Sequence, residues 1–300
     1  MTQSWPTFLV IGAARAGTTA LYTYLRQHPG VFMSPRKETN FFAFEGERLD
    51  YAGPGADYVN NSVHDAAAYQ QLFADAPPGA ARGEASPLYL WSREAPARIH
   101  RHVPDVRLIA ILRDPVEQVY SHFLYAKRQT LEPLDDFEQA MAAEEERARL
   151  RWMPMFQYSS FPRYAEQLRR YYALFPAERI RVFTYEEFSD ELPRVMADIF
   201  RFIGVDPGFV PDLGYRPNAG GVPKSGLLQR LVMQPNALNR VVGRLLPEEL
   251  KRRIRDAISD KNLDRPDIPP RARAALLERL HGDIEDLQRL LGRDLSRWLR

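Results

Sequence analysis

A run of small residues near the amino terminus carries groups that can bind a phosphate. Gly12-Ala13-Ala14-Arg15-Ala16-Gly17-Thr18-Thr19 follows an apolar segment and precedes a segment of helical spacing. In that setting successive backbone N–H groups and a helix N-terminus can surround an anion. Two glycines alone would serve a tight turn with nothing bound, but an arginine and paired threonines are more than a turn requires. The run therefore predicts an anion-binding loop.

The loop differs from a Walker A loop, GxxxxGK[ST], at one position. Thr18 stands where the lysine would be, and the cation is Arg15, inside the loop. A magnesium-dependent phosphotransferase also uses an aspartate that ends a hydrophobic strand, whereas the apolar run 108–112 ends in Arg113 before Asp114. A P-loop phosphotransferase is therefore the less favoured interpretation, and a non-catalytic nucleotide-binding module is a second alternative.

Strands that alternate with helices must position this loop. Three apolar, partly β-branched runs predict strands buried on both faces, at residues 8–11, 107–112 and 180–185. Helical spacing follows each strand, over residues 18–26, 115–124 and 193–203, and Thr18 or Thr19 can cap the first helix. Such alternation implies right-handed crossovers. The predicted fold class is therefore α/β, a three-layer sandwich with a central parallel sheet and the P-loop-like loop at the carboxyl ends of its strands.

Length and charge favour one ordinary globular domain. The 300 residues exceed the usual domain length of ~100–200, but α/β folds often use that length as one unit, so we expect a single domain over 1–300. Helical excursions are expected near 131–155 and 226–300, and a polar surface excursion at 45–65. The 41 lysines and arginines against 39 aspartates and glutamates produce no strong field, which argues against nucleic acid as a partner.

The sequence lacks both cysteines and a recognisable targeting segment, which bears on the expected location of the protein. There are no cysteines, which excludes disulfides, thiolate metal sites and a cysteine nucleophile. The amino terminus lacks a cationic segment, and the apolar run 8–11 is too short for a signal peptide or a membrane span. We therefore expect a cytoplasmic protein without a membrane span.

Two motifs resemble those of sulfotransferases that use 3′-phosphoadenosine 5′-phosphosulfate (PAPS). Arg15-Ala16-Gly17-Thr18-Thr19 resembles the 5′-phosphosulfate loop of that family, usually K-x-G-T-T. Leu112-Arg113-Asp114-Pro115, with Ser121 on the following helix, resembles its 3′-phosphate motif. Segments 37–42, 83–90 and 291–298 also resemble family sequences. The resemblance covers nearly the whole chain and is to the bacterial and heparan sulfate branch of the family.

The resemblance implies a reaction and the residues that carry it. A sulfuryl group would pass from PAPS to a hydroxyl or amine of a small-molecule, lipid or carbohydrate acceptor, with release of adenosine 3′,5′-bisphosphate and no metal. Glu38 would be the catalytic base, and Arg15 would stabilise charge on the leaving group. The expected donor-binding residues are Arg15, Ala16, Gly17, Thr18, Thr19, Arg113, Ser121 and Lys224.

For several of these residues a purely structural role stays open as an alternative. Glu38 can simply pair with Lys37 on a solvated loop, and His122 is either a second possible base or a packed histidine. Arg113 can pair with Asp114 at a strand end. The cation of Lys224 can lie free in solvent.

Three departures from the family pattern bear on the acceptor. Arg15 replaces the usual lysine, and Asn40 and Ala85 replace a histidine and a lysine of the glycosaminoglycan enzymes, which weakens the case for a polyanionic sugar. Aromatic residues that could line an acceptor cleft, or instead form core, are Phe41, Phe42, Phe44, Tyr51 and Tyr58. Neither the acceptor nor the oligomeric state follows from the sequence.

Overall fold

The computed structural model describes residues 4–213, 222–223, 263–264 and 266–300. Five strands form a parallel sheet in the order β2-β3-β1-β4-β5. Their bounds are β1 Phe8–Gly12, β2 Val31–Met33, β3 Ala81–Ala85, β4 Arg107–Leu112 and β5 Ile180–Thr184. Every residue of β1 is buried, as are five of the six residues of β4, because a strand in the middle of such a sheet is covered on both faces.

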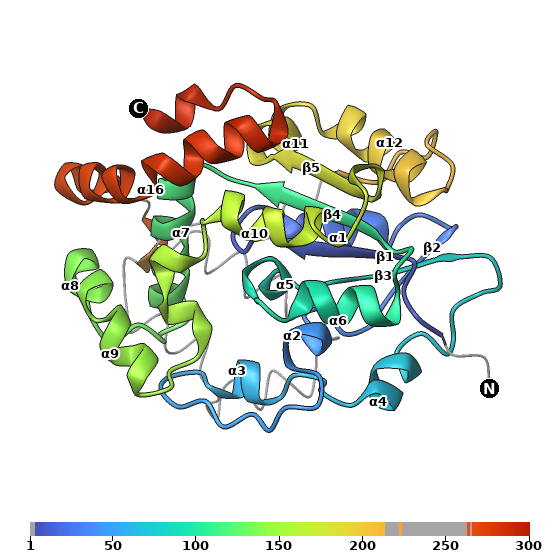
Figure 1. The fold of residues 1–300 in the computed structure, drawn as a ribbon, viewed down its shortest axis with the longest axis horizontal. Coiled ribbons are helices and arrows are strands. Elements are labelled where there is room, and N and C mark those ends of the chain that lie inside the picture. Colours follow the sequence, from blue (N-terminus) through green and yellow to red (C-terminus); the bar gives the residue numbers. More distant parts are fainter. Residues whose placement is uncertain (1–3, 214–221, 224–262, 265) are drawn as a thin grey trace.

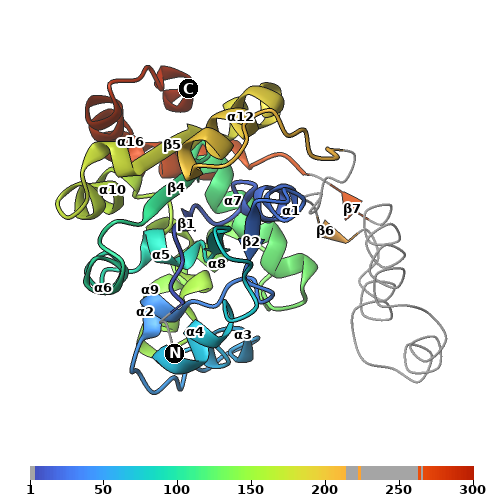
Figure 2. The ribbon, with the colours of Figure 1, turned by 90° about the vertical axis from the view of Figure 1, so that its right-hand side faces the viewer.

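Helices cover both faces of the sheet (Figures 1 and 2). In Figure 2, α6 (Ala95–His102) and α10 (Tyr164–Tyr172) lie on one side of the strands, and α1 (Thr18–Leu25) and α12 (Leu192–Ile203) lie on the other. Short helix α5 (Leu88–Trp91) packs on β1, and α1 packs on β2 and β3. The predicted three-layer α/β sandwich with a central parallel sheet is confirmed.

The remaining elements surround these layers. Helix α7 (Pro115–Arg128) follows β4, and α16 (Pro270–Leu291) packs against both α7 and α10. The others are α2 Phe41–Phe44, α3 Asp57–Asn60, α4 Ala66–Gln71, α8 Phe137–Ala142, α9 Glu144–Arg149, α11 Tyr185–Asp190, the 3₁₀ turns η1 Pro154–Phe156, η2 Tyr158–Ser160, η3 Ala177–Arg179 and η4 Ser296–Leu299, and the antiparallel pair β6 Val222–Pro223 and β7 Leu263–Asp264. None of the helices in the described ranges is long and apolar enough to span a membrane.

Two strands of the parallel sheet were absent from the sequence prediction. Strand β2 has only three residues, and β3 contains Gly83 and Glu84, which interrupt an apolar pattern. Gly83 is required by packing, since a Cβ there would lie 2.1 Å from the ring of Phe8 on the neighbouring strand. The contacts that define β3 are thus made with β1 and β2, not with its own sequence neighbours.

Some helix boundaries were predicted correctly from the sequence and others were not. Helix α12 ends at Gly204, which has φ 84° as expected for a C-terminal glycine. The prediction that Thr18 or Thr19 caps α1 is wrong, because Gly17 enters the helix with φ 91° and both threonines belong to the first turn. The excursion near 131–155 contains two short helices, α8 and α9, with the break at Ala143. About half of the excursion predicted at 226–300 lies outside the described residues, and α16 and η4 belong to the described half.

Candidate active site

A cavity of about 1010 Å³ opens where β1 and β4 end. Its volume is at the upper end of the ~300–1,000 Å³ usual for one small-molecule site, which leaves room for two ligands. It is lined by the loop after β1, the segment 36–40, α3, α7 and the segment 153–161. Ligands bind at the carboxyl ends of parallel strands, so the anion loop is where the sequence predicted.

Hydrogen bonds from neighbouring elements hold the loop in shape. Ala13 donates its backbone N–H to the carbonyl of Ile111 at 2.7 Å. The buried amide of Gln118, on α7, donates to the Ala14 carbonyl at 3.1 Å. The sequence analysis missed Gln118, whose only signal is its position one turn along α7. The strand–helix unit β4–α7 thus braces the loop that follows β1.

The loop amides divide into two groups. The N–H of Ala16 donates back to the Ala13 carbonyl at 3.3 Å, within the turn. Gly17 precedes α1, and Thr18 and Thr19 are its first residues, where helix geometry leaves the N–H groups without an intrahelical acceptor. Gly17, Thr18 and Thr19 all line the cavity, so their backbone N–H groups can donate to an anion. The N–H of Ala16 already has an acceptor within the loop.

Arg15 is the central cation of the cavity. It has φ 63°, and its guanidinium lies 4.4 Å from the centre of the Tyr125 ring. Its Nε is buried and has no hydrogen-bond partner among the described residues. Burial lowers the pKa of Arg15 to about 10, with Tyr125 acting in the opposite direction, so the side chain stays protonated at neutral pH. A buried charged donor without an acceptor fits a site for an anion.

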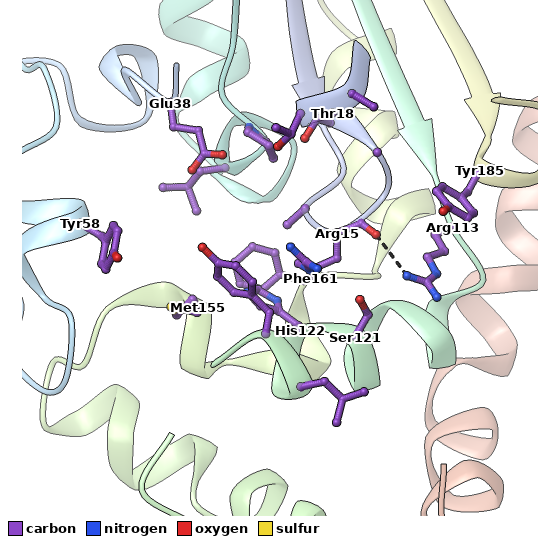
Figure 3. Close-up of a pocket in the computed structure, with 18 of the residues that line it drawn as sticks. Arg15, Thr18, Glu38, Tyr58, Arg113, Ser121, His122, Met155, Phe161 and Tyr185 are labelled. Carbon is purple, nitrogen blue, oxygen red and sulfur yellow. Dashed lines mark hydrogen bonds between the residues drawn. The ribbon is translucent and has the colours of Figure 1, made fainter. Parts of the chain in front are cut away.

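Arg113 and Ser121 enter the same cavity from β4 and α7. The Arg113 guanidinium lies 5.2 Å from the Tyr185 ring centre and donates to the Arg15 carbonyl at 3.4 Å. Figure 3 shows Arg113, Ser121 and Tyr185 together on one side of Arg15. Asp114 does not pair with Arg113, because its carboxylate caps α7 through two backbone N–H groups at 2.9 and 3.1 Å. Lys224 lies outside the described residues.

Glu38 faces Arg15 from the other side (Figure 3). It has φ 60°, its backbone N–H donates to the Ala85 carbonyl at 3.0 Å, and its half-exposed carboxylate pairs with Lys37. The pairing expected of a solvated loop is therefore present, but Glu38 also lines the cavity.

A buried carboxylate supports the loop that carries Glu38. Glu84 accepts hydrogen bonds from Ser86 at 2.7 Å and from the Tyr89 hydroxyl at 2.5 Å. The Ser86 hydroxyl in turn accepts the backbone N–H of Asn40 at 3.1 Å. Burial raises the pKa of Glu84, and the hydrogen bonds partly oppose that rise. This network ties the end of β3 to the segment after Glu38.

His122 is a buried side chain whose pKa is lowered. Its ring lies edge-on to Phe161, with ring centres 4.7 Å apart, and its Nδ1 has no hydrogen-bond partner among the described residues. Burial, and to a smaller extent the charge of Arg15, lowers the pKa of His122 to about 3. The ring is therefore neutral at pH 7 and a poor acceptor of a further proton.

Most of the aromatic residues proposed for an acceptor cleft belong to the core. Phe41, Phe42 and Phe44 are buried, and Phe41 stacks on Tyr69 with ring centres 4.4 Å apart. Tyr51 packs against Phe44, and only Tyr58 lines the cavity. The side chains that occupy the expected place are Leu131, Met153, Met155 and Phe161. Leu131 precedes α8, and the other three lie in or beside the 3₁₀ turns η1 and η2, which are too short to show a sequence periodicity.

No group of three or more potential metal ligands is found among the residues that the structure describes. What the site gathers is cationic and amide donors on one side and a carboxylate on the other. Such an arrangement suits transfer of an anionic group between two bound molecules.

Comparison with known proteins agrees with this geometry. A family model described as "Sulfotransferase family" matches residues 6–209. A solved sulfotransferase from Alicyclobacillus acidocaldarius is 29% identical, with a TM-score of 0.77 and 99% of both chains covered. A mouse sulfotransferase, SULT7A1, complexed with PAP, has a TM-score of 0.52 at 10% identity over 96% of this chain and 87% of its own, which shows a common fold.

Among curated proteins, human bifunctional heparan sulfate N-deacetylase/N-sulfotransferase 3 is 26% identical over 224 residues. The match covers 68% of this chain and 23% of the human protein, so the chain spans about a quarter of that relative's length. The matched family segment contains the loop with Arg15, Glu38, Arg113 and Ser121. The chain therefore belongs to the sulfotransferase family.

Proposed function

We propose that this protein transfers a sulfuryl group from PAPS to an acceptor hydroxyl or amine and releases adenosine 3′,5′-bisphosphate. The observation that carries the proposal is the convergence of Arg15, Arg113, Ser121 and the first-turn amides of α1 on one cavity. The Nε of Arg15, which has no hydrogen-bond partner among the described residues, fits the need for a further acceptor atom there. Family membership and the fold shared with a PAP complex support the same reaction.

Each donor-binding residue has a distinct role in this proposal. Arg15 and the amides of Gly17, Thr18 and Thr19 hold the 5′-phosphosulfate. Arg113 and Ser121 hold the 3′-phosphate, since both lie beyond Arg15 from Glu38. Lys224 remains a predicted additional clamp on that phosphate.

The acid–base work falls to the opposite side of the cavity. Glu38 takes the proton from the acceptor hydroxyl or amine. Arg15 stabilises the negative charge that grows on the leaving phosphate oxygen. His122 is the less suitable base, because burial and the neighbouring Arg15 both oppose its protonation.

A phosphotransferase is not favoured, since the loop has no lysine at the Walker A position and Arg113 stands where that chemistry would use an acid. Calorimetry tests this point. Adenosine 3′,5′-bisphosphate should bind at least tenfold more tightly than ADP with magnesium, and Arg113→Ala should remove that preference. Tight binding of ADP alone would overturn the proposed donor.

Transfer of labelled sulfate from PAPS separates an enzyme from a non-catalytic binding module. Glu38→Ala should lower the transfer rate by about 10²–10⁴-fold, as for loss of a general base, and leave binding of adenosine 3′,5′-bisphosphate unchanged. His122→Ala is the matched variant, expected to keep most of the activity. Full activity in Glu38→Ala with loss in His122→Ala would reverse the assignment of the base.

We also propose the domain organisation, origin and location of the protein. One sulfotransferase domain over 1–300, a bacterial origin and a cytoplasmic location are consistent with the similarity to the Alicyclobacillus enzyme over 99% of the chain. Limited proteolysis, which should yield no stable half-length fragment, tests the single domain, and cell fractionation tests the location.

A further inference from the structure

The half of the cavity on the Glu38 side, here called the acceptor end, carries side chains of a distinct chemistry. In Figure 3, Tyr58 and Met155 lie on this side of Arg15, away from Arg113 and Ser121. We propose that the acceptor is an uncharged alcohol or phenol carried on an apolar body. This inference rests on the proposed sulfuryl transfer and adds the acceptor class to it.

One wall of the acceptor end is apolar. It consists of Leu131, Met153, Pro154, Met155 and Phe161, all of which line the cavity. Tyr58 lies across from Met155 and is 63% exposed, an unusual exposure for a large aromatic side chain in this chain. Leu131 and Met155 are partly exposed, whereas Met153, Pro154 and Phe161 are buried, so the apolar surface open to a ligand comes mainly from Leu131, Met155 and Tyr58. Covering that surface with an apolar ligand is favourable. Methionine side chains also adapt to ligands of irregular shape.

The charges at the acceptor end cancel. The cations that line it are Arg36 and Lys37, and the anions are Glu38 and Asp57. Lys37 pairs with Glu38, and Arg36 donates to the Asn61 carbonyl. A polyanionic sugar needs several cations outside ion pairs, whereas the described lining of the acceptor end offers one, Arg36, whose hydrogen bond to the Asn61 carbonyl leaves its charge intact. An uncharged acceptor avoids repulsion from Asp57 and Glu38.

Several polar side chains that a neutral sugar would use already have partners in the protein. Asn40 lines the cavity, but its side-chain amide donates to Ser62 at 3.1 Å. The backbone of the neighbouring turn is held against the wall, because a Cβ on Gly55 would lie 2.8 Å from Leu131 and 3.0 Å from Met153. The acceptor end thus offers the carboxylates of Glu38 and Asp57 to a hydroxyl, and its apolar wall to the rest of the molecule.

The apolar wall is held in place by a buried network behind it. Arg147 donates both terminal nitrogens to the Glu132 carboxylate at 2.8 and 2.7 Å. The Tyr158 hydroxyl donates to the same carboxylate at 2.6 Å. Glu132 follows Leu131, and Tyr158 lies between Met155 and Phe161, so the network anchors both ends of the wall. The wall is therefore preformed for its ligand.

The chemical step is balanced with this acceptor. The hydroxyl oxygen forms a bond to sulfur, and its proton passes to Glu38. The bond between sulfur and the phosphate oxygen breaks, and its electron pair stays on that oxygen, near Arg15. The products are a sulfate ester and adenosine 3′,5′-bisphosphate, and no further reactant is needed.

A panel of three acceptors tests the inference with the full chain and labelled PAPS. The panel contains 2-naphthol, methyl glucoside and a glucuronate-containing oligosaccharide. We expect kcat/KM for 2-naphthol to exceed both others at least tenfold. A preference for either sugar would overturn the inference, and so would transfer to none of the three by a protein that binds adenosine 3′,5′-bisphosphate. Failure to bind that nucleotide would instead contradict the proposed function.

Charged substitutions locate the acceptor on the wall. Met155→Asp and Tyr58→Asp should each raise KM for 2-naphthol at least tenfold and leave the affinity for adenosine 3′,5′-bisphosphate unchanged. Leu150→Asp is the matched control, since Leu150 is 54% exposed on the same excursion and does not line the cavity. It should leave KM unchanged. The inference fails if Met155→Asp and Tyr58→Asp, folded by circular dichroism, keep the KM of the original protein.

Discussion

The two ends of the cavity differ in how they are built. The donor end uses residues that directly follow strands β1 and β4, in two strand–loop–helix units braced by Gln118 and Arg113. The acceptor end uses α3, Leu131 before α8, and residues 153–161 after α9, which form short 3₁₀ turns. Strand ends can hold charged donors at set positions, whereas a wall of short turns can vary in shape without loss of the sheet. The donor chemistry is therefore common to the family, and the acceptor chemistry belongs to this chain.

The largest effect is expected from the network behind the acceptor wall. Arg147→Met leaves the buried Glu132 carboxylate without its cation, so the free energy of unfolding should fall by about 3–5 kcal/mol, as measured by urea denaturation. Arg149→Met is the matched control, because Arg149 is exposed on the same helix and pairs only at the surface. Equal stability of both variants would show that the wall does not depend on this network.

A somewhat smaller effect, confined to catalysis, is expected at the donor end. Arg15→Ala removes the cation that faces the leaving phosphate, so kcat should fall by about 10²–10³-fold, measured as sulfate transfer at saturating PAPS. Arg15→Lys should retain part of the activity, because a lysine also supplies a cation, but the burial that lowers the pKa of Arg15 would also lower the pKa of that lysine from its ordinary value of about 10.4. An Arg15→Ala protein that is as active as the original would remove Arg15 from the mechanism.

The smallest effect concerns Glu84, beneath the loop that joins the two ends. Its pKa is raised in the folded protein above the ordinary 4.5, so the folded state binds the proton more tightly than the unfolded state. Stability is therefore lost as pH rises from about the ordinary value through the raised one. Glu84→Gln carries no titrating proton, and the difference in Tm between the two proteins should change across that range. A constant difference between pH 4 and 8 would contradict this linkage.

Much of the donor end could be predicted from the sequence. The strands at 8–12, 107–112 and 180–184 are short, apolar runs, and the anion loop, Arg113 and Ser121 follow them at fixed spacing. The proline at the start of α7 and the glycine after α12 also marked helix boundaries in the sequence. Arg15, Glu38, Arg113 and Ser121 do line one cavity, because parallel strands bring their carboxyl ends together.

Other features depended on contacts between distant segments. Strand β3 contains Gly83 because Phe8 occupies the space above it, and Phe41 and Phe42 were drawn into the core by Tyr69 and Trp5. The neutral state of His122 at pH 7 comes from burial against Phe161 and the nearby Arg15. None of these neighbours is adjacent in the sequence.

The sequence by itself determined the fold class and the position of the loop after β1, and it predicted the donor-binding residues, since each depends on hydrophobic periodicity or on residue types at short spacing. Only the tertiary structure decided which side chains line the acceptor end. Tyr58, Leu131 and Met155 are far apart in the chain and line one cavity, because α3, the residues before α8 and the residues after α9 come together there. Contacts between short, separate segments follow no sequence periodicity, so the lining of the acceptor end can be identified only in the folded structure.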